Sequence, residues 1–255
     1  MLTTDLSGRA LLVTGGASGI GLAVAERCAR MGASVAINHL PDDPRGADVA
    51  RRLTAEGLKV HSAPGDVGNP DAAAAMVRGA LDCLGGLDYL FNNAGTPGGT
   101  EPYDFKKLEL MTEEFWHRLL DINLVSMFRV TREARDALVA RKGAVVNTAS
   151  VAGINMKGSS IVYGATKAGI INLTINLARS LAPDVRVNAV APGLVDSPWT
   201  KEWPAARKQS IVGRTMLKRM ATPNDIADAV IFLLAGNNYI TGQTIVVDGG
   251  MIHGD

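Results

Sequence analysis

Short apolar runs alternate along the chain with segments in which apolar residues recur at helical spacing. Several runs lack a regular polar alternation, which is typical of parallel strands that are covered by helices on both faces. The predicted strands are Ala10–Thr14, Ser34–Asn38, Lys59–Ser62, Tyr89–Asn92, Ala144–Thr148, Arg186–Ala191 and Thr244–Val247.

Helices are predicted between these strands, and glycine or proline marks several of their ends. Gly32 and Gly57 follow two helical patterns as expected for helix stops, and Asn69-Pro70 is a start signal for a third. The predicted helices are Ile20–Met31, Asp48–Glu56, Asp71–Leu84, Thr112–Ala140 (one long helix or two in tandem), Tyr163–Leu181 and Asp225–Leu234.

Strands separated by helices predict right-handed βαβ units and therefore an α/β fold. We expect a single doubly wound, Rossmann-type domain over residues 1–255, with a seven-stranded parallel sheet and helices on both faces. Residues 96–110 and 197–220 are irregular in pattern. Because ligands bind beyond the carboxyl ends of such strands, these segments are candidate pocket walls, and 197–220 is a candidate substrate loop or lid.

Composition excludes several classes of protein. The 255 residues are 47% apolar and 20% charged, as in a soluble domain, and 26 basic against 25 acidic residues leave no electrostatic footprint for nucleic acid or an anionic membrane. Two cysteines build no disulfide framework, and no Cys/His cluster has zinc spacing, so no metal site is expected. With no targeting segment or long apolar stretch in view, we expect a cytoplasmic protein.

A glycine-rich turn follows the first predicted strand. Gly15, Gly19 and Gly21 have the spacing G-x-x-x-G-x-G, and the helix that starts there would aim free N–H groups at a pyrophosphate. A plain connecting turn is the alternative, but a place between a first strand and an Ala-rich helix favours dinucleotide binding.

The end of the second strand gives no clear sign of which dinucleotide is bound. An acidic residue often holds the ribose 2′-OH there, yet this strand ends Ile37-Asn38-His39-Leu40, and Asp42 and Asp43 lie beyond a proline. Ser18 and Leu40 offer no positive charge to a 2′-phosphate, whereas Arg45 or His39 could. We expect NADP, by a slight preference, or NAD.

A serine, a tyrosine and a lysine carry the candidate chemistry. Ser150 follows a strand, and Tyr163 and Lys167 share one face of a predicted helix at i and i+4. An ammonium group within about 4–6 Å lowers the pKa of a phenol, which suits it to general acid–base work. Such pairs also occur by chance, and the glycine turn and Ser150 give this one its weight.

In this order and spacing, the motifs resemble those of the short-chain dehydrogenases/reductases of the compact, one-domain type. The match runs essentially end to end, with similarity to 3-oxoacyl-carrier-protein reductases and to reductases of sugars, polyols, steroids and small ketones. The motifs are Thr14-Gly15-Gly16-Ala17-Ser18-Gly19-Ile20-Gly21, Asp66-Val67, Asn92-Asn93-Ala94-Gly95, Asn123, Ser150, Tyr163-x-x-x-Lys167 and Pro192-Gly193.

The resemblance implies roles for the matching residues. Tyr163 would exchange the proton, Ser150 would polarise the carbonyl, Lys167 would also bind the nicotinamide ribose, and Asn123 would kink the long helix and hold a water in a relay to Lys167. Asn123 could instead be a buried hydrogen-bonding residue, and Asp66, expected at the adenine, could cap a turn. The expected cofactor site comprises Gly15, Ser18, Gly19, Ile20, Gly21, His39, Asp66, Val67, Asn93, Ala94, Gly95, Tyr163, Lys167, Pro192, Gly193 and Val195.

The expected function is that of an NAD(P)-dependent oxidoreductase that interconverts a carbonyl and a secondary alcohol of a small molecule by hydride transfer. A 3-oxoacyl-carrier-protein reductase and a non-catalytic redox sensor that binds a dinucleotide are the alternatives. The first would need a basic patch, for which Arg129 and Arg132 are candidates, although Glu133 could pair with Arg129. The resemblance also implies a homotetramer. Five apolar residues in 197–220 would either form a lid over the pocket or simply pack against the rest of the protein. They are Trp199, Trp203, Met216, Leu217 and Met220.

Overall fold

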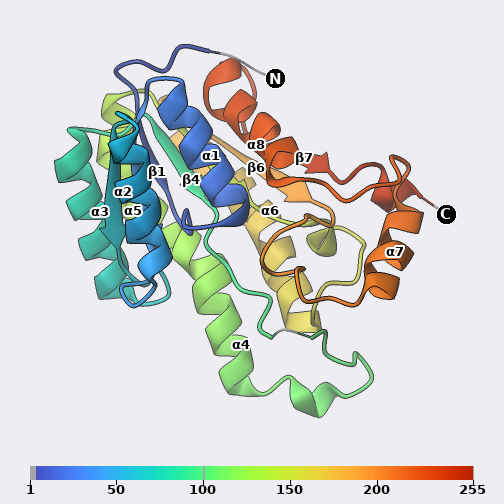
Figure 1. Ribbon diagram of the computed structural model, residues 1–255. Coiled ribbons are helices and arrows are strands. Elements are labelled where there is room, and N and C mark those ends of the chain that lie inside the picture. The colour runs from blue at the N-terminus through green and yellow to red at the C-terminus, as the bar shows by residue number, and fades with distance from the viewer. Residues whose placement is uncertain (1–3, 100, 255) are drawn as a thin grey trace.

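The computed structural model describes residues 4–99 and 101–254, and within them seven strands form one wholly parallel sheet in the order β3-β2-β1-β4-β5-β6-β7 (Figure 1). The order reverses between β1 and β4, which is the switch point of a doubly wound fold. The prediction of fold class is confirmed. The strands are β1 (Ala10–Val13), β2 (Ser34–His39), β3 (Val60–Pro64), β4 (Tyr89–Asn92), β5 (Ala144–Thr148), β6 (Arg186–Pro192) and β7 (Thr244–Val247).

Helices cover both faces of the sheet. Helices α1, α2 and α8 contribute to one apolar core, and α3, α5 and α6 contribute to the other. Figure 1 shows α1 beside α8 and α3 beside α5, as their contacts require. The helices are α1 (Gly19–Arg30), α2 (Pro44–Ala55), α3 (Pro70–Leu84), α4 (Glu113–Leu120), α5 (Ser126–Ala140), α6 (Ile161–Leu181), α7 (Ala205–Arg214) and α8 (Pro223–Ile231).

The same strands contribute side chains to both cores, because successive side chains of a strand point to opposite faces of the sheet. In β1, Leu11 and Val13 belong to the core beneath α1 and α8, whereas Leu12 belongs to the core beneath α3 and α5. All three side chains are fully buried. Continuous apolar strands are therefore what a sheet with two covered faces requires.

Local capping explains where several helices begin. Asn69 accepts hydrogen bonds from the backbone N–H groups of Asp71 and Ala72 at the start of α3, and Thr222 and Asp225 form a capping box at the start of α8. Asp43 likewise caps α2, which begins at Pro44 rather than at the predicted Asp48. The sequence signal for α3 thus corresponds to a real cap.

The structure adds detail to the predicted elements in two further regions. The segment Thr112–Ala140 forms two helices in tandem, which was one of the two predicted forms, and a π-helical turn at Asp121–Val125 separates α4 from α5. Helix α7 lies inside 197–220, which the pattern gave as irregular, and none of its residues is buried, so it shows no clear apolar stripe. Thr100, within the irregular segment 96–110, lies outside the described residues.

Candidate active site

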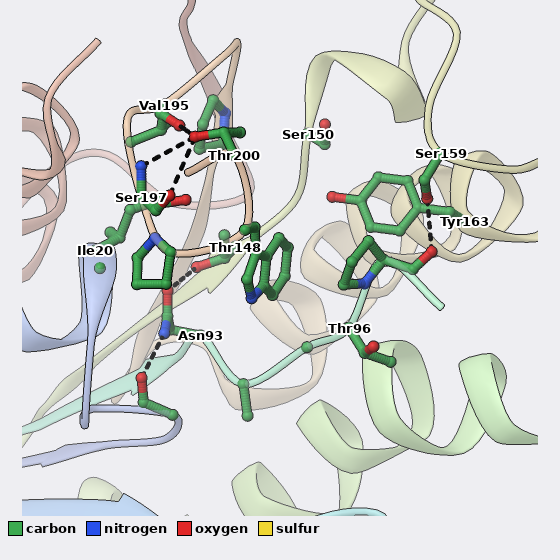
Figure 2. Close-up of a pocket in the computed structure, with 18 of the residues that line it drawn as sticks. Ile20, Asn93, Thr96, Thr148, Ser150, Ser159, Tyr163, Val195, Ser197 and Thr200 are labelled. Carbon is green, nitrogen blue, oxygen red and sulfur yellow. Dashed lines mark hydrogen bonds between the residues drawn. The ribbon is translucent and has the colours of Figure 1, made fainter. Parts of the chain in front are cut away.

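A cavity of about 670 Å³ lies at the carboxyl ends of the strands. Its walls come from the turn after β1, the ends of β2, β4, β5 and β6, and the segment that leads into α7 (Figure 2). This is the edge of a parallel sheet where ligands bind, next to the switch point between β1 and β4. The volume falls within the range of small-molecule and cofactor pockets, about 300–1,000 Å³.

The glycine turn forms one end of this cavity. Gly15 and Gly19 have positive φ angles of 62° and 57°, which side chains other than glycine rarely adopt. A Cβ atom on Gly21 would lie 2.4 Å from the carbonyl oxygen of Gly15. Ser18 precedes α1, and its side chain makes no capping hydrogen bond. The first N–H groups of α1 are thereby left for an anion in the cavity.

Asn38, which the sequence analysis did not single out, holds the glycine turn in place. Its Oδ1 atom accepts a hydrogen bond of 3.2 Å from the Gly15 N–H, and its Nδ2 atom donates to the carbonyl oxygens of Ala63 and Gly65 at 3.1 and 2.9 Å. The side chain therefore joins the turns after β1 and β3. A buried amide in an otherwise apolar strand was the available signal, because such a group needs partners.

The segment after β4 forms the adjoining part of the cavity. The backbone N–H groups of Asn93 and Ala94 donate to the Thr14 hydroxyl at 2.9 and 3.0 Å, and Asn93 Nδ2 donates to Gly15 O at 3.1 Å. Asn93, Ala94 and Gly95 all line the cavity, as expected. Asn92 lies beneath this surface, where its amide bonds to Thr131 and Asn147.

The ring nitrogens of His39 are not free to bind a phosphate group, as the sequence analysis had expected them to be. Its Nδ1 atom lies 2.8 Å from Leu40 O, its Nε2 atom lies 2.7 Å from the Ser62 hydroxyl, and the side chain is buried against Gly46. Both ring nitrogens already have protein partners. Arg45 also lines the cavity, pairs with Asp43 and is 62% exposed, so it remains free to turn toward a ligand.

Asp66 and Val67 line the cavity beyond β3, as expected of residues near an adenine. Asp66 Oδ1 also accepts a hydrogen bond of 2.8 Å from the Gly68 N–H. The turn-capping role that the sequence left open is therefore present, and the other carboxylate oxygen has no hydrogen bond among the described residues.

Pro192, Gly193 and Val195 form a wall at the end of β6. A Cβ atom on Gly193 would lie 2.8 Å from the Asp248 Cβ, so this position has no room for a side chain. The Thr200 hydroxyl donates to the Val195 carbonyl oxygen at 3.0 Å and thereby fixes the start of the segment that leads to α7 (Figure 2).

Ser150 and Tyr163 approach one another on the opposite wall. Ser150 follows β5 and caps a short 3₁₀ turn, while Tyr163 lies in the first turn of α6, which Ser160 caps. Figure 2 shows the phenolic oxygen of Tyr163 pointing into the cavity on the side of Ser150. Desolvation by the surrounding protein raises the pKa of Tyr163 to about 12, and hydrogen bonding to Ser150 opposes this rise.

Lys167 lies one helical turn from Tyr163, but its main partner is a backbone carbonyl. Its Nζ atom donates to Thr148 O at 2.7 Å, the residue is 2% exposed, and Nζ is 5.6 Å from the centre of the Tyr163 ring. Burial lowers the pKa of Lys167 to about 7. The expected lowering of the tyrosine pKa is therefore wrong, because burial disfavours the charged form of both groups.

Asn123 lies in the π-helical turn between α4 and α5 and is completely buried. Its Oδ1 atom accepts from the Thr96 N–H at 2.7 Å, and its Nδ2 atom donates to Thr96 O at 3.0 Å. The long helix is interrupted where this residue was expected to kink it. The Asn123 amide forms its hydrogen bonds with the segment after β4. This agrees with the alternative expectation that Asn123 is a buried hydrogen-bonding residue.

Two of the five apolar residues expected to form a lid or ordinary packing belong to the cavity wall. Trp199 and Trp203 both line it, whereas Met216 and Leu217 are more than half exposed and lie outside the lining. Met220 is also absent from the lining. A lid formed by 197–220 stays a prediction, and the two tryptophans are the residues of this segment that are placed for it.

The residues around the cavity suit a nicotinamide dinucleotide. A helix N-terminus with an uncapped first turn can take the pyrophosphate, and glycine backbone permits close approach there. The Tyr163 and Ser150 hydroxyls lie along the same cavity. Among the described residues, no group of three or more His, Cys, Asp or Glu side chains is arranged to hold a metal ion, and no helix is long and apolar enough to cross a membrane.

Comparisons with known proteins agree with this geometry. The family described as Enoyl-(Acyl carrier protein) reductase matches residues 15–252. A 3-oxoacyl-[acyl-carrier-protein] reductase of Staphylococcus aureus is 35% identical over 246 residues, which are 95% of this chain and 98% of the relative. The dehydrogenase/reductase SDR family member 4 of Oryctolagus cuniculus is 36% identical over 250 residues, which are 96% of this chain and 94% of the relative.

Solved structures give the same result. A double mutant of a Serratia marcescens short-chain dehydrogenase/reductase has a TM-score of 0.87 and 29% identity, with 97% of this chain and 99% of that chain covered. Sequence and fold agree over nearly the whole length. The chain therefore belongs to the short-chain dehydrogenase/reductase family and is an NAD(P)-dependent oxidoreductase that interconverts a carbonyl group and an alcohol.

Proposed function

We propose that this protein reduces the carbonyl group of a small molecule, with Tyr163 as the proton donor and Ser150 as the residue that orients the carbonyl oxygen. The convergence of the two hydroxyls on one cavity wall carries the proposal. A pKa of about 12 keeps the phenol protonated near neutral pH, as a donor to a developing alkoxide must be. The cofactor, when bound, supplies the hydride.

In this proposal Lys167 positions the strand end that carries Ser150. Its hydrogen bond to Thr148 joins α6 to the end of β5, and Ser150 lies two residues beyond Thr148. A nicotinamide ribose beside this amine would find a buried hydrogen-bond donor. Asn123 in turn fixes the segment after β4 through Thr96, which also lines the cavity.

The experiment that tests this function is a screen of small ketones and secondary alcohols with NADH, NADPH and their oxidised forms, followed at the nicotinamide absorbance band. We expect at least one ketone to be reduced, and we expect the Tyr163→Phe variant to bind cofactor without turning it over. Full turnover in that variant would overturn the assignment of Tyr163.

We propose NADP as the preferred cofactor, and Arg45 as the residue that binds its 2′-phosphate. Arg45 is the support for this choice, since His39 has both nitrogens occupied and β2 ends without a carboxylate. Its guanidinium pairs with Asp43 at 2.7 Å and could exchange this partner for a phosphate. Thermal-shift titration with each cofactor tests the preference, because a ligand of the native state raises its stability.

The names of the relatives favour a second substrate class, a 3-oxoacyl group carried on a protein. The basic residues suggested for such a carrier do not favour it, because Arg129 and Arg132 do not line the cavity. Arg129 pairs with Asp121, Glu133 pairs with Arg78, and Arg132 lies over the Phe128 ring. A 3-oxoacyl thioester of a small thiol, compared with simple ketones, separates the two classes.

We also propose a homotetramer. In support, Phe128 on α5 and Ile245 on the edge strand β7 are 41% and 38% exposed, so each offers apolar surface that a second copy of the chain would cover. Light scattering coupled to size exclusion measures the mass directly, and a single species at the mass of one chain would contradict the proposal.

The cytoplasmic location of the protein, expected from its sequence, stays a prediction.

A further inference from the structure

Three cations that the proposed reaction does not use lie in the lining of the cavity. They are Arg118, Lys157 and Arg207, and Glu101 belongs to the same lining. Arg118 donates to Gly98 O at 3.1 Å, and Lys157 Nζ lies 5.8 Å from the centre of the Phe105 ring. Since the whole chain is almost neutral, this excess of cations is local.

Arg207 is the most enclosed of these cations. It lies on α7, its guanidinium carbon is 3.4 Å from the centre of the Trp203 ring, and its side chain is 24% exposed. Stacking on an indole holds the guanidinium plane in one orientation. Burial lowers the pKa of Arg207 and the charge of Glu101 opposes this, but an arginine stays charged at any ordinary pH.

The guanidinium makes little use of its hydrogen-bonding capacity. A guanidinium carries five N–H donors. Among the described residues, its recorded acceptor is Glu101, at 3.3 Å between Nη1 and Oε2, and the Glu101 side chain is 71% exposed. A long contact to a solvated carboxylate offsets only part of the cost of enclosing a charge.

Trp203 supplies a second unsatisfied group at the same place. Its Nε1 atom is buried and has no hydrogen-bond partner among the described residues. A buried donor without an acceptor is uncommon in native proteins, and this one is enclosed by protein, so an oxyanion would reach it only after the indole turns. The ring that carries this donor lines the cavity and stacks on Arg207.

We propose that Arg207 and Trp203 form a subsite for an oxyanion on the substrate, a carboxylate or a phosphate, and that Glu101 occupies part of this subsite when no substrate is bound. The substrate would then be an oxo acid or an oxo phosphate ester, or the matching hydroxy compound. The inference rests on the proposed function, because it places this oxyanion in the same cavity as Tyr163 and Ser150.

Matched substrates test the subsite. The pairs are acetoacetate with methyl acetoacetate, 4-oxopentanoate with its methyl ester, and dihydroxyacetone phosphate with dihydroxyacetone. We expect kcat/KM of wild-type protein to favour the anionic member of one class, and Arg207→Gln to lower that ratio about tenfold or more, as the loss of a charge-assisted hydrogen bond would. Preference among the pairs separates a carboxylate from a phosphate.

The Glu101→Gln variant distinguishes two roles for Glu101. In one, its carboxylate competes with the substrate oxyanion for Arg207; in the other, its ion pair with Arg207 only holds α7 in place. As a competitor, Glu101 should keep anions out, so its neutralisation should lower KM for the anionic member and raise the ratio severalfold. In the second role, its loss should change both members of a pair alike. The control is Arg214→Gln, an exposed arginine on the same helix that does not line the cavity, which should leave the ratio unchanged.

Tryptophan fluorescence gives a readout that does not depend on turnover. Titration of wild-type protein with 4-oxopentanoate or dihydroxyacetone phosphate should change the emission saturably, and Arg207→Gln should abolish this change. An unaltered ratio and an unaltered titration in Arg207→Gln would overturn the subsite alone. A chain that reduces no ketone yet shows the Arg207-dependent titration would overturn the proposed reaction and leave the subsite standing.

Discussion

The Nζ atom of Lys167 lies 2.7 Å from the carbonyl oxygen of Thr148, so α6 is tied to the end of β5 at the point where the active-site cavity begins. Lys167 is almost completely buried at this position. A buried amine with one neutral acceptor is easier to deprotonate than an exposed one. The lysine therefore couples the protonation state of the site to the stability of the fold.

Replacement of Tyr163 by Phe should lower kcat by about a hundredfold or more, since general acid catalysis contributes roughly 10²–10⁴-fold. Cofactor affinity should change little, because the ring remains. Isothermal titration with NADPH and steady-state rates measure the two separately. Tyr239→Phe is the control, because Tyr239 is 99% exposed and lies outside the cavity. Equal rates for the two variants would refute the role of Tyr163.

The stability of the protein should rise with pH above about 7 because of Lys167. Burial lowers its pKa from 10.5 to about 7 in the folded chain, so between these values the unfolded chain binds more protons. The folded state is then favoured as pH increases, by on the order of 1–2 kcal/mol between pH 7 and 9.

The Lys167→Met variant isolates this contribution. Urea denaturation of both proteins at pH 7 and 9 gives the difference in the free energy of unfolding. We expect the wild-type protein to gain stability relative to Lys167→Met over this interval. A difference that does not vary with pH would show that Lys167 keeps an ordinary pKa.

Replacement of Gly21 by Ala should destabilise the glycine turn. The new Cβ would lie 2.4 Å from Gly15 O and 2.7 Å from Asn93 Nδ2, so the backbone must shift, at a cost of about 1–3 kcal/mol. Thermal unfolding and cofactor titration should both show the loss. In Gly79→Ala, where no atom lies within 4 Å of the new Cβ, the gain in helix propensity should stabilise α3 by about 0.5–1 kcal/mol.

Replacement of Arg45 by Gln should weaken NADP binding about tenfold or more, the effect of one charge-assisted hydrogen bond to a phosphate. NAD, which lacks the 2′-phosphate, should bind as before. Thermal shifts with each cofactor measure this change, and Arg51→Gln serves as the control because Arg51 is on the same helix, outside the cavity. Parallel losses for both cofactors would exclude a specific contact between Arg45 and the phosphate.

Local sequence information determined the fold. Each strand was predicted within two residues of its observed ends, because an apolar run covered on both faces differs from a helical stripe at short range. The cap of α3 was equally visible, since Asn69 acts on its immediate neighbours. Helix α7 was missed, because it buries none of its residues.

The residues of the candidate site could also be located from the chain. The turn at Gly15 follows β1, and Tyr163 and Lys167 share a face of α6, as their spacing required. What these residues do there depends on partners that are distant in sequence. His39 forms a hydrogen bond with Ser62, and Asn123 forms one with Thr96. Neither contact can be read from the residues next to it in the sequence.

The sequence alone determined the order of elements, the glycine turn and the proximity of the tyrosine to the lysine, because all three depend on residues a few positions apart. Only the tertiary structure decided that burial raises the pKa of Tyr163 while it lowers that of Lys167, and that Arg207 contacts both Trp203 and Glu101 in the cavity wall. Desolvation and ion pairing depend on everything that surrounds a group, which is fixed only when distant segments pack together.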